Sequence, residues 1–270
     1  MFGDLRDRTA LVTGGASGIG RGICLALAEQ GASVAVADIN LEGAETVVAE
    51  VANEGVRTLA TAVDVTNKKS IEEMVTQVMD RWGQLDILVN DAGVIGAPDW
   101  WKRDENTEED WQYSFDVNMK GVALATEVSS VYMKERKFGK VINISSIAAL
   151  RGSPEYPHYN ASKAAVVSYT QSAAIQLGPF NINVNAVCPG LLWTPMWELI
   201  SYRHSRSATD SSLHGLSQRE VFDKIVSDST PLGREQTPRD IGKLTVFLAS
   251  EDALNITGQA FIVDGGRTAT

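Results

Sequence analysis

The stretch TGGASGIG, residues 13–20, decides the fold. It follows an apolar run at residues 9–13 that predicts a buried strand. It also opens a helical pattern at residues 18–30 that puts Ile19, Ile23 and Leu27 on one face. A glycine-rich turn lets the backbone approach a ligand closely, and the helix then presents free N–H groups and its positive dipole end to an anion. The stretch therefore predicts a phosphate-binding turn between a strand and a helix.

The rest of the chain repeats this alternation of strands and helices. Further strands are expected at residues 33–38, 58–63, 85–90, 140–144, 183–187 and 260–263. Helical patterns fall between them at residues 41–54, 68–82, 108–134, 159–178 and 238–249. Such an order is typical of a parallel sheet with helices on both faces. The sequence predicts one doubly wound α/β domain over residues 1–270, of about seven strands, with residues 191–236 inserted as a substrate lid.

Composition narrows the class of protein. The chain has 270 residues, 44% hydrophobic and 21% charged, which is ordinary for a globular domain. Its net charge of -10 disfavours nucleic acid as a partner, because nucleic-acid phosphates would be repelled. The sequence shows neither a signal peptide nor the roughly 20 apolar residues of a membrane span, so we expect a cytoplasmic protein without a membrane partner. Two isolated cysteines, Cys24 and Cys188, predict no metal site.

Polar and turn-forming residues follow strand after strand. In an open parallel sheet, ligands bind outside the carboxyl ends of the strands, so these residues share one expected site. After the glycine stretch they are Asp38, Asp64-Val65, Asn90-Asp91-Ala92-Gly93, Ser145-Ser146 and Pro189-Gly190. Each is an ordinary strand end when taken alone, but their succession along one edge predicts a binding site there.

Asp38 indicates which nucleotide is bound. It lies 18 residues past Gly20, at the end of the second expected strand. A carboxylate there accepts hydrogen bonds from the adenosine ribose hydroxyls and repels a 2′-phosphate. Its neighbours Ala37 and Ile39 are uncharged. Ser17 occupies the turn position from which a basic side chain could have reached that phosphate. Both observations favour NAD over NADP. The alternative for Asp38 is a solvated cap of the next helix. The stretch also lacks the Gly-Lys-Ser/Thr ending of nucleotide triphosphatases.

A tyrosine and a lysine are spaced for proton transfer. Tyr159 and Lys163 are four residues apart at the start of a helical pattern, so they share a face. A phenol has a pKa near 10, and a cation within reach favours the phenolate and lowers that value. The pair is therefore a candidate acid/base unit. Since this spacing also occurs on many helix surfaces, it does not identify a catalytic pair by itself.

Together these residues resemble the short-chain dehydrogenase/reductase family over nearly the whole chain. The matching segments are residues 13–20, 64–65, 90–93, Asn118, Ser146, 159–163, 189–190 and 263–266. The resemblance implies that Tyr159 is the general acid/base and that Lys163 binds the nicotinamide ribose and lowers the tyrosine pKa. It implies that Ser146, rather than Ser145, holds the substrate oxygen. Asn118 resembles the family's fourth member, which holds a water linked to the lysine, although an asparagine can instead bond local backbone.

The resemblance also implies a cofactor site and an assembly. The NAD-binding set would be Gly14, Ser17, Gly18, Ile19, Gly20, Asp38, Asp64, Val65, Asn90, Ala92, Gly93, Tyr159, Lys163, Pro189, Gly190, Leu192 and Thr194. Asp64 and Val65 would flank the adenine, Asn90 would brace its strand, and Thr194 would donate to the carboxamide. Asp91 departs from the family, which often has asparagine there. A homotetramer is expected, with the helices at 108–134 and 159–178 and the last strand at its interfaces.

The substrate is the least determined part. Expected pocket walls are Trp100, Trp101, Arg151, His158, Trp193, Trp197, Tyr202 and His204. Aromatic rings suit an alicyclic or sugar-like ring, while Arg151 is either a partner for an anionic group or a surface residue. The leading hypothesis is an NAD-dependent oxidoreductase that moves a hydride between the cofactor and a secondary alcohol, from the small polyols, sugars or cyclic alcohols. Alternatives are a ketone reductase and a non-catalytic dinucleotide-binding protein.

Overall fold

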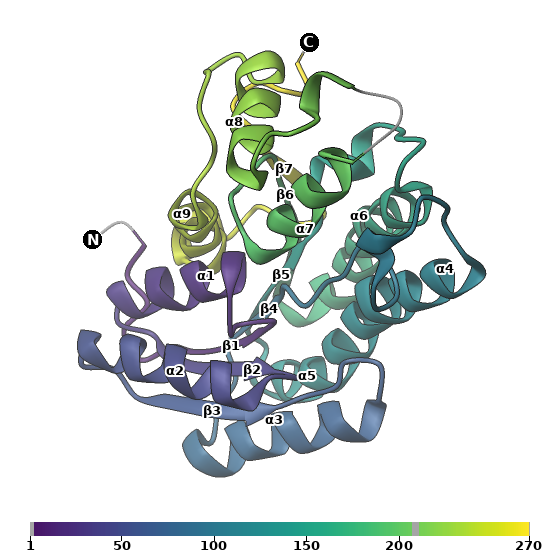
Figure 1. Ribbon diagram of the computed structural model, residues 1–270. Coiled ribbons are helices and arrows are strands. Elements are labelled where there is room, and N and C mark those ends of the chain that lie inside the picture. The colour runs from purple at the N-terminus through teal and green to yellow at the C-terminus, as the bar shows by residue number, and fades with distance from the viewer. Residues whose placement is uncertain (1–2, 207–210, 270) are drawn as a thin grey trace.

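The computed structural model describes residues 3–206 and 211–269. Within them, seven strands form one parallel sheet in the order β3-β2-β1-β4-β5-β6-β7 (Figure 1). The strands are β1 (Thr9–Thr13), β2 (Ser33–Asp38), β3 (Thr58–Ala62), β4 (Ile87–Asn90), β5 (Gly139–Ile144), β6 (Ile182–Pro189) and β7 (Ala260–Val263). The predicted doubly wound α/β fold is confirmed.

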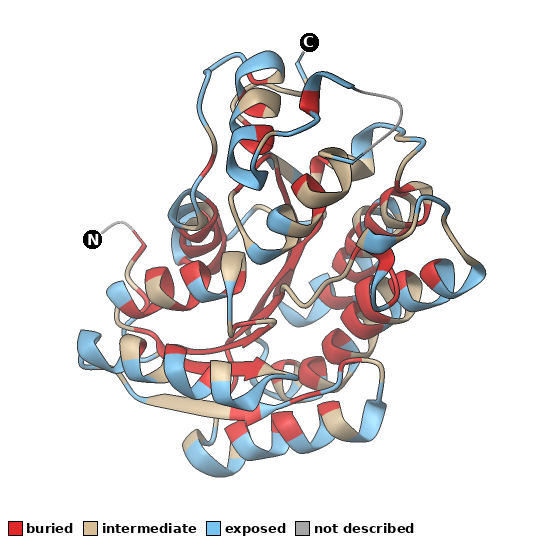
Figure 2. Ribbon diagram, in the orientation of Figure 1, coloured by how far each residue is buried: buried red, intermediate tan, exposed pale blue. Residues whose placement is uncertain are grey.

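Helices cover both faces of the sheet (Figure 1). α1 (Gly18–Glu29), α2 (Leu41–Val51) and α9 (Pro238–Ala249) pack on one face, and α3 (Lys68–Trp82), α5 (Gly121–Arg136) and α6 (Pro157–Leu177) on the other. The central strands are therefore buried on both sides, as the red ribbons of Figure 2 show, and read as continuous apolar runs. α1 and α9 pack closely at Gly22, which has no side chain to keep them apart. A Cβ on Gly22 would lie 2.3 Å from Pro238.

The strand order reverses between β1 and β4, and this reversal positions the site. The chain leaves β1 toward β2 and β3, then returns to the other side of β1 as β4. The loops after β1 and β4 therefore face one another at the carboxyl edge: a Cβ on Gly14 would lie only 2.7 Å from the Ala92 nitrogen. Doubly wound sheets bind ligands at such a switch point.

Some predicted boundaries were wrong. The pattern at 108–134 is not one α-helix, because α4 (Glu108–Phe115) and α5 are separated by a five-residue π-helical turn, Asp116–Lys120. π-helical turns of this kind often occur at functional sites, and this one carries Asn118. The predicted strand at 183–187 extends over the whole of β6, up to Pro189.

The insertion at 191–236 has more structure than its polar sequence suggests. It contains α7 (Pro195–His204) and α8 (Gln218–Ser229), which lie above the carboxyl ends of the strands in Figure 1. Apolar side chains anchor this segment, because Ile200, Leu213, Val221 and Phe222 are buried. Ile200 lies on α7, Val221 and Phe222 lie on α8, and Leu213 ends the short 3-10 helix between them.

Candidate active site

The glycine turn folds tightly between β1 and α1. Gly14 and Gly18 have φ values of +70° and +52°, which favour glycine. At Gly20 a Cβ would lie 2.2 Å from the Gly14 carbonyl oxygen, so this position needs glycine for a second reason. The Gly15 N–H donates to the Ala37 carbonyl at 3.1 Å, which ties the turn to the end of β2.

The start of α1 is open to an anion. Ser17, the residue before the helix, is exposed and its side chain caps none of the helix N–H groups, and the first turn has no acidic residue. By contrast, α2, α3, α4, α7, α8 and α9 each begin with a side-chain cap. The free N–H groups and positive dipole of α1 therefore suit a pyrophosphate, and the residues present fit a dinucleotide.

Asp38 lies beside this turn at the end of β2. One carboxylate oxygen accepts from the Ala16 N–H at 3.1 Å, and the other accepts from the Asn40 N–H at 3.0 Å. The side chain is only half-buried, so its remaining lone pairs can take ribose hydroxyls. The alternative role as a helix cap falls to Asn40, whose side chain accepts from the Gly43 N–H at 3.1 Å.

The edge of the sheet beyond Asp38 offers a place for an adenine. Val65 is buried and packs against Gly121, where a Cβ would lie 2.9 Å from the Val65 side chain. Asp64 is exposed, and its carboxylate accepts from the Thr66 N–H at 2.9 Å and hydroxyl at 2.7 Å. Its side chain therefore shapes its own turn, which leaves Val65 as the apolar surface of this corner.

The loop after β4 is held by amide side chains. The Asn90 side chain donates to the side-chain oxygen of Asn143 on β5 at 2.8 Å and to the Thr126 hydroxyl on α5 at 3.2 Å. Asn143 in turn donates to Thr170 on α6 at 2.9 Å. This buried chain joins two strands and two helices beneath the site. Sequence reasoning missed Asn143 and Thr170, because only the fold brings them to Asn90.

Asn118 bonds the loop after β4. Its carbonyl oxygen accepts from the Val94 N–H at 2.8 Å, and its amide donates to the Val94 carbonyl at 2.8 Å and to the Ser162 hydroxyl at 2.9 Å. The π-helical turn thus fixes the segment that follows Gly93. The backbone-bonding alternative describes this geometry. Lys163 is close by, because a Cβ on Gly93 would lie 3.2 Å from the Lys163 Nζ.

Ser146, Tyr159 and Lys163 come together at the ends of β5 and α6. Ser146 and Tyr159 line one cavity, and the Ser146 hydroxyl is close enough to lower the pKa of the Tyr159 phenol. The Lys163 Nζ lies 5.9 Å from the centre of the Tyr159 ring and donates to the Ile144 carbonyl at 3.0 Å. Ser145 lies next to the group, but its hydroxyl donates to the Lys163 carbonyl at 2.8 Å, which is a helix-anchoring contact.

The pKa of Tyr159 differs from the sequence-based expectation that Lys163 lowers it. From the protein's own groups, burial raises the pKa of Tyr159 to about 12, against a smaller lowering by the hydrogen bond to Ser146. Burial also lowers the pKa of Lys163, and nearby Asp91 opposes that shift. Lys163 alone therefore does not bring the tyrosine pKa below its ordinary value. The phenolate needs a further positive charge beside it.

Asp91 supplies a second titratable group beneath the site. Its carboxylate accepts a hydrogen bond from the Gly20 N–H, burial raises its pKa, and attraction to Lys163 opposes that rise. The charge therefore interacts with Lys163 as well as with the glycine turn. An asparagine at this position could accept the same hydrogen bond without adding a charge.

The segment after β6 closes the cofactor side. A Cβ on Gly190 would lie 2.4 Å from the Gln236 side-chain oxygen, and that oxygen accepts from the Leu191 N–H at 2.7 Å. Thr194 lies against the glycine turn, since a Cβ on Gly18 would lie 3.4 Å from its methyl group. Leu192 and Pro189 line the same cavity as Tyr159. The glycine turn and the segment after β6 therefore meet at Gly18 and Thr194.

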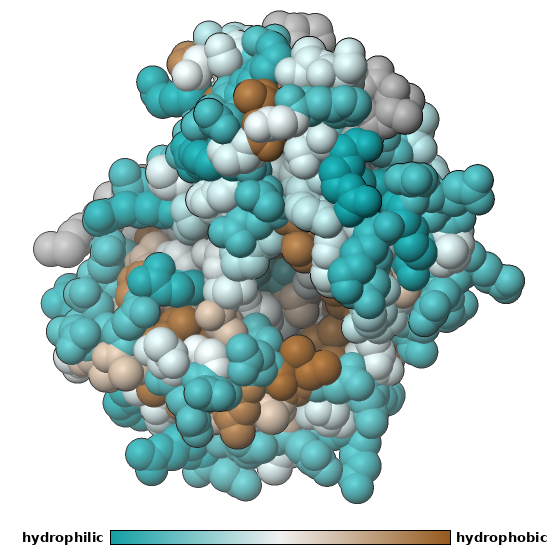
Figure 3. Space-filling view, viewed as in Figure 1, coloured by the Kyte–Doolittle hydropathy of each residue, from teal (hydrophilic) through white to brown (hydrophobic). Residues whose placement is uncertain are grey.

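A cavity of about 500 Å³ opens over Ser146 and Tyr159. Figure 3 shows a hollow near the centre of this face, with brown apolar surface beside it. Of the expected wall residues, Arg151, Trp197 and His204 line the cavity. The expectation failed for Trp100, Trp101, His158, Trp193 and Tyr202, which do not line it.

Packing explains these misplaced aromatic residues. Trp100 packs edge-on against Tyr156 at 5.5 Å, Trp193 packs against Phe222 at 5.2 Å, and His158 contacts Trp111 at 6.0 Å. Their rings therefore support the walls from behind. The apolar walls missed from sequence are Ile95, Ile147, Tyr156, Met196, Ile200, Leu213 and Ile225. They come from the loop after β4, the stretch after Ser146 and the 191–236 insertion, so only the fold brings them together.

Two other kinds of site were searched for in the part of the chain that the structure describes. No group of three or more histidine, cysteine, aspartate or glutamate side chains is placed to hold a metal ion. No helix there has both the length and the apolar character needed to cross a membrane.

Known proteins resemble this chain over nearly its whole length. Residues 14–268 match the family model described as Enoyl-(Acyl carrier protein) reductase. The chain is 38% identical to (2S)-[(R)-hydroxy(phenyl)methyl]succinyl-CoA dehydrogenase subunit BbsD of Thauera aromatica, over 98% of each chain. It is 39% identical to galactitol 2-dehydrogenase of Agrobacterium fabrum, over 97% of this chain and 98% of that one. The crystal structure of NAD⁺-bound xylitol dehydrogenase superposes with a TM-score of 0.86 at 29% identity, over 97% and 99% of the two chains.

The fold and the site thus define an oxidoreductase of the dinucleotide-binding type. The chain belongs to the short-chain dehydrogenase/reductase family, as its glycine turn and its serine, tyrosine and lysine suggest. Hydride transfer between a nicotinamide cofactor and a secondary alcohol or its ketone is the chemistry that this class performs.

Proposed function

We propose that this protein is an NAD-dependent dehydrogenase of a secondary alcohol, with Ser146, Tyr159 and Lys163 as catalytic residues. The observation that carries the proposal is the open N-terminus of α1 with a half-exposed Asp38 beside it, at the same sheet edge as the cavity that Ser146 and Tyr159 line together. A carboxylate at this place repels the 2′-phosphate of NADP and accepts the ribose hydroxyls of NAD.

The chain's own residues divide the proton chemistry between them. Ser146 donates a hydrogen bond to the substrate oxygen, which positions the hydroxyl within reach of Tyr159. Tyr159 takes the hydroxyl proton in oxidation and returns it in reduction. Lys163 holds the nicotinamide ribose and keeps a positive charge 5.9 Å from the tyrosine ring. When bound, NAD supplies the hydride acceptor and a further positive charge, which the raised pKa of Tyr159 requires.

Asn118 is a positioning residue in this proposal. It bonds both backbone groups of Val94 and the Ser162 hydroxyl, so it holds the loop after β4 against α6. Those three hydrogen bonds use most of its amide capacity. A water chain from Lys163 would therefore start at the opened backbone of the π-helical turn rather than at a free amide side chain.

The cavity favours a cyclic alcohol within the class of small polyols, sugars and cyclic alcohols. Its lining includes Ile95, Ile147, Met196 and Trp197, whose apolar side chains can pack against the flat faces of a ring. Oxidation is the expected direction with NAD, and ketone reduction uses the same residues in reverse.

The decisive experiment is an activity screen of the purified protein. NAD and NADP would each be offered with cyclohexanol, cyclopentanol, butanediol, sorbitol and galactitol, and NADH formation followed by absorbance. We expect turnover with NAD, best with the cyclic alcohols. Equal rates with NADP would contradict the role given to Asp38. Binding of NAD without turnover of any alcohol would instead favour the non-catalytic alternative.

We further propose that the protein assembles as a homotetramer through α4–α5, α6 and the β7 edge. Large apolar side chains are exposed there: Trp111 and Val131 on the first surface, Ile175 on α6 and Ile262 on β7. Apolar groups of this size on regular elements are typical of interfaces between subunits. Light scattering at micromolar concentration tests this, and a monomeric mass would contradict it.

Residues 191–236 are proposed to act as a lid. α7 contributes Met196, Trp197 and Ile200 to the cavity, so substrate contacts this segment directly. Ligands that fill the cavity should therefore slow its hydrogen exchange. Equal exchange in α7 with and without cofactor and a ring alcohol would contradict the proposal.

A further inference from the structure

Asp91 places a carboxylate against the glycine turn from the loop after β4. A Cβ on Gly20 would lie 2.7 Å from the Asp91 Oδ2 atom, so the carboxylate packs against the first turn of α1. The backbone N–H groups of Asp91 and Ala92 donate to the Thr13 hydroxyl on β1 at 3.3 Å and 3.4 Å. The residue is half-buried. The carboxylate therefore has a fixed place in surroundings that are partly shielded from water.

Lys163 reaches the same loop from α6. A Cβ on Gly93 would lie 3.2 Å from the Lys163 Nζ and 3.5 Å from the Asp91 carbonyl oxygen. The hydrogen bond to the Ile144 carbonyl at 3.0 Å holds the Nζ there. Burial lowers the pKa of Lys163, and the charge of Asp91 is the largest influence against that shift. The two side chains thus carry opposite charges that attract one another where water screens them little.

The other titratable groups around this pair do not replace Asp91. They are Cys24 on α1, Asp38 at the end of β2, Tyr159 on α6 and Cys188 on β6. Burial raises the pKa of both thiols and of the phenol, so these three groups are neutral at pH 7 in the protein without a cofactor. Asp38 acts on Asp91 as a like charge, and its own carboxylate accepts from two backbone N–H groups. Asp91 is therefore the counter-charge to Lys163.

A neutral side chain of the same shape would also fit this position. Asparagine, which the family resemblance leads us to expect here, has an oxygen that accepts hydrogen bonds without carrying a charge. Burial disfavours an ionised carboxylate and an ionised ammonium alike, and each charge offsets part of that cost for the other. What Asp91 adds over asparagine is thus a charge, and the cation on which this charge acts is Lys163.

We propose that Asp91 acts through Lys163, as the counter-charge that keeps its ammonium protonated at the alkaline pH where alcohol oxidation is fastest. This inference rests on the proposed dehydrogenase function. Burial on its own favours the neutral amine, which would no longer attract the phenolate of Tyr159. The neutral amine also has one hydrogen-bond donor fewer for the ribose and the Ile144 carbonyl. With Asp91 ionised, the site keeps the cation that proton transfer requires.

The first test is the pH profile of Asp91→Asn, which keeps the shape and removes the charge. We would measure kcat/KM for cyclohexanol at saturating NAD from pH 6 to 10.5. In the wild type it should rise as Tyr159 loses its proton and fall again only when Lys163 loses its own. In the variant this alkaline fall should begin about one pH unit lower, which is about a tenfold loss at a given pH on the falling limb. Asp91 also raises the pKa of Tyr159, so the rising limb moves too and only the falling limb reports Lys163.

Glu73→Gln is the matched control for the change in net charge. Glu73 is exposed on α3 and pairs with Lys69 at 3.7 Å, on the same helix. Its loss removes the same unit of negative charge from the protein surface, so the falling limb should keep its wild-type position. A falling limb at the same pH in Asp91→Asn and in the wild type overturns the inference.

A second measurement needs neither cofactor nor alcohol. Asp91→Asn, Lys163→Met and the double variant would be unfolded in urea at pH 8 and at one protein concentration. Lys163→Met leaves Asp91 without its counter-charge, so the two changes should not be independent. The unfolding equilibrium constant of the double variant should differ from the product of the single effects by about tenfold. Independent effects, within about twofold, overturn the inference while the dehydrogenase function stands. If no alcohol is oxidised, the proposed function fails, and this comparison alone decides the inference.

Discussion

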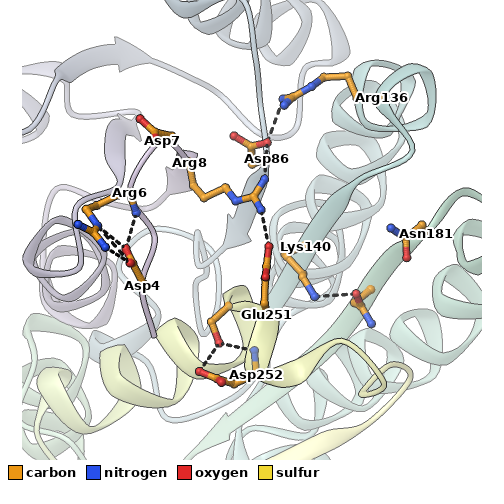
Figure 4. A network of polar contacts seen from close by, with 12 residues as sticks. Asp4, Arg6, Asp7, Arg8, Asp86, Arg136, Lys140, Asn181, Glu251 and Asp252 are labelled. Atoms are coloured by element: carbon orange, nitrogen blue, oxygen red, sulfur yellow. Dashed lines mark hydrogen bonds and ion pairs between the residues drawn. The ribbon is translucent and has the colours of Figure 1, made fainter. Parts of the chain in front are cut away.

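Buried charges at the two ends of this parallel sheet differ in how completely protein groups pair them. At the amino ends of the strands, Asp86 is fully buried and accepts from the Thr9 N–H at 2.8 Å and from Gln84 at 3.1 Å. It also accepts from Arg136 at 2.9 Å (Figure 4). Arg8 lies between Asp86 and Glu251, 3.8 Å and 3.1 Å away. This cluster is closed, because protein groups surround its buried carboxylate.

At the carboxyl ends the charges are left open. Within the residues that the structure describes, the Lys163 ammonium has one hydrogen-bond acceptor, the Ile144 carbonyl, although it has three donors. Burial shifts the pKa values of Tyr159, Lys163 and Asp91 in the directions that disfavour their charged forms. Perturbed groups without a full set of partners gather where a ligand completes them.

The difference teaches that burial alone does not mark a functional charge. Asp86 is as buried as any group at the site, yet its partners are fixed and belong to the sheet. The distinguishing features of the catalytic edge are the missing partners and the adjoining cavity. The variants below test whether the two ends behave as this comparison requires.

The largest effect is expected at the open end. Tyr159→Phe removes the proton-transfer group and keeps the ring, so turnover should fall by about 10²–10⁴-fold. Because the ring still packs against the same neighbours, NAD affinity should change little. Steady-state rates and NAD titration by fluorescence measure the two quantities. Residual activity above about a tenth of wild type would show that another group takes the proton.

The pH dependence gives this prediction a second readout. Tyr159 must lose its proton to act as a base, so kcat/KM for alcohol oxidation at saturating NAD should rise with pH. The apparent pKa should lie well below the value of about 12 set by the protein's own groups, because the bound cofactor adds positive charge. A flat profile from pH 6 to 10 would contradict a titrating tyrosine.

The closed end should respond in stability instead. Asp86→Ala leaves Arg136 and the Thr9 N–H without a buried partner, so the free energy of unfolding should fall by about 3–5 kcal/mol. Activity per folded molecule should stay near wild type, since the cluster lies at the far end of the strands. Urea unfolding and activity assays measure both. Glu251→Gln is the matched control: Glu251 contacts the same Arg8 but is exposed, and its loss should cost under about 1 kcal/mol.

A smaller change in specificity is expected beside the glycine turn. Asp38→Ala with Ile39→Arg removes the carboxylate that repels a 2′-phosphate and adds a cation for it. Ile39 is 75% exposed, so an arginine there displaces no packing. The ratio of NADP to NAD affinity should rise by about 100-fold, as charge-assisted hydrogen bonds permit. Titration with both cofactors measures the ratio, and an unchanged ratio would remove Asp38 from the specificity site.

The sequence anticipates the open end better than the closed one. Glycines, Asp38 and the tyrosine–lysine pair lie in short motifs whose spacing itself carries the chemistry. The partners of Asp86 and Asn90 come from separate elements, so no local pattern points to them. The predicted cavity walls were wrong for the same reason. Trp100 and Trp193 are near the cavity in sequence, but packing against Tyr156 and Phe222 turns their rings away from it.

Lys140 is a buried charge at the amino ends of the strands that does not follow the pattern of Asp86. It is fully buried on β5, its ammonium donates to the Asn183 side chain at 2.8 Å, and its partner is neutral (Figure 4). Burial, with a contribution from nearby Arg8, lowers the pKa of Lys140 to about 8. A perturbed and incompletely paired charge thus occurs away from the catalytic edge, where no described cavity adjoins it.

If Lys140 is purely structural, it should affect the pH dependence of stability and nothing else. Between pH 8 and its ordinary value near 10.5, the unfolded chain binds more protons at this lysine than the folded chain does, so its contribution to stability rises with pH. Lys140→Met removes that contribution. The wild type should therefore gain about 1–2 kcal/mol on the variant between pH 8 and 9.5, below the range where ordinary tyrosines titrate. Urea unfolding at several pH values measures the slope, and the variant's kcat should match wild type. Parallel stability curves would mean that the lysine is neutral or solvated in the folded protein, and a lower kcat would mean that the closed end also acts on catalysis.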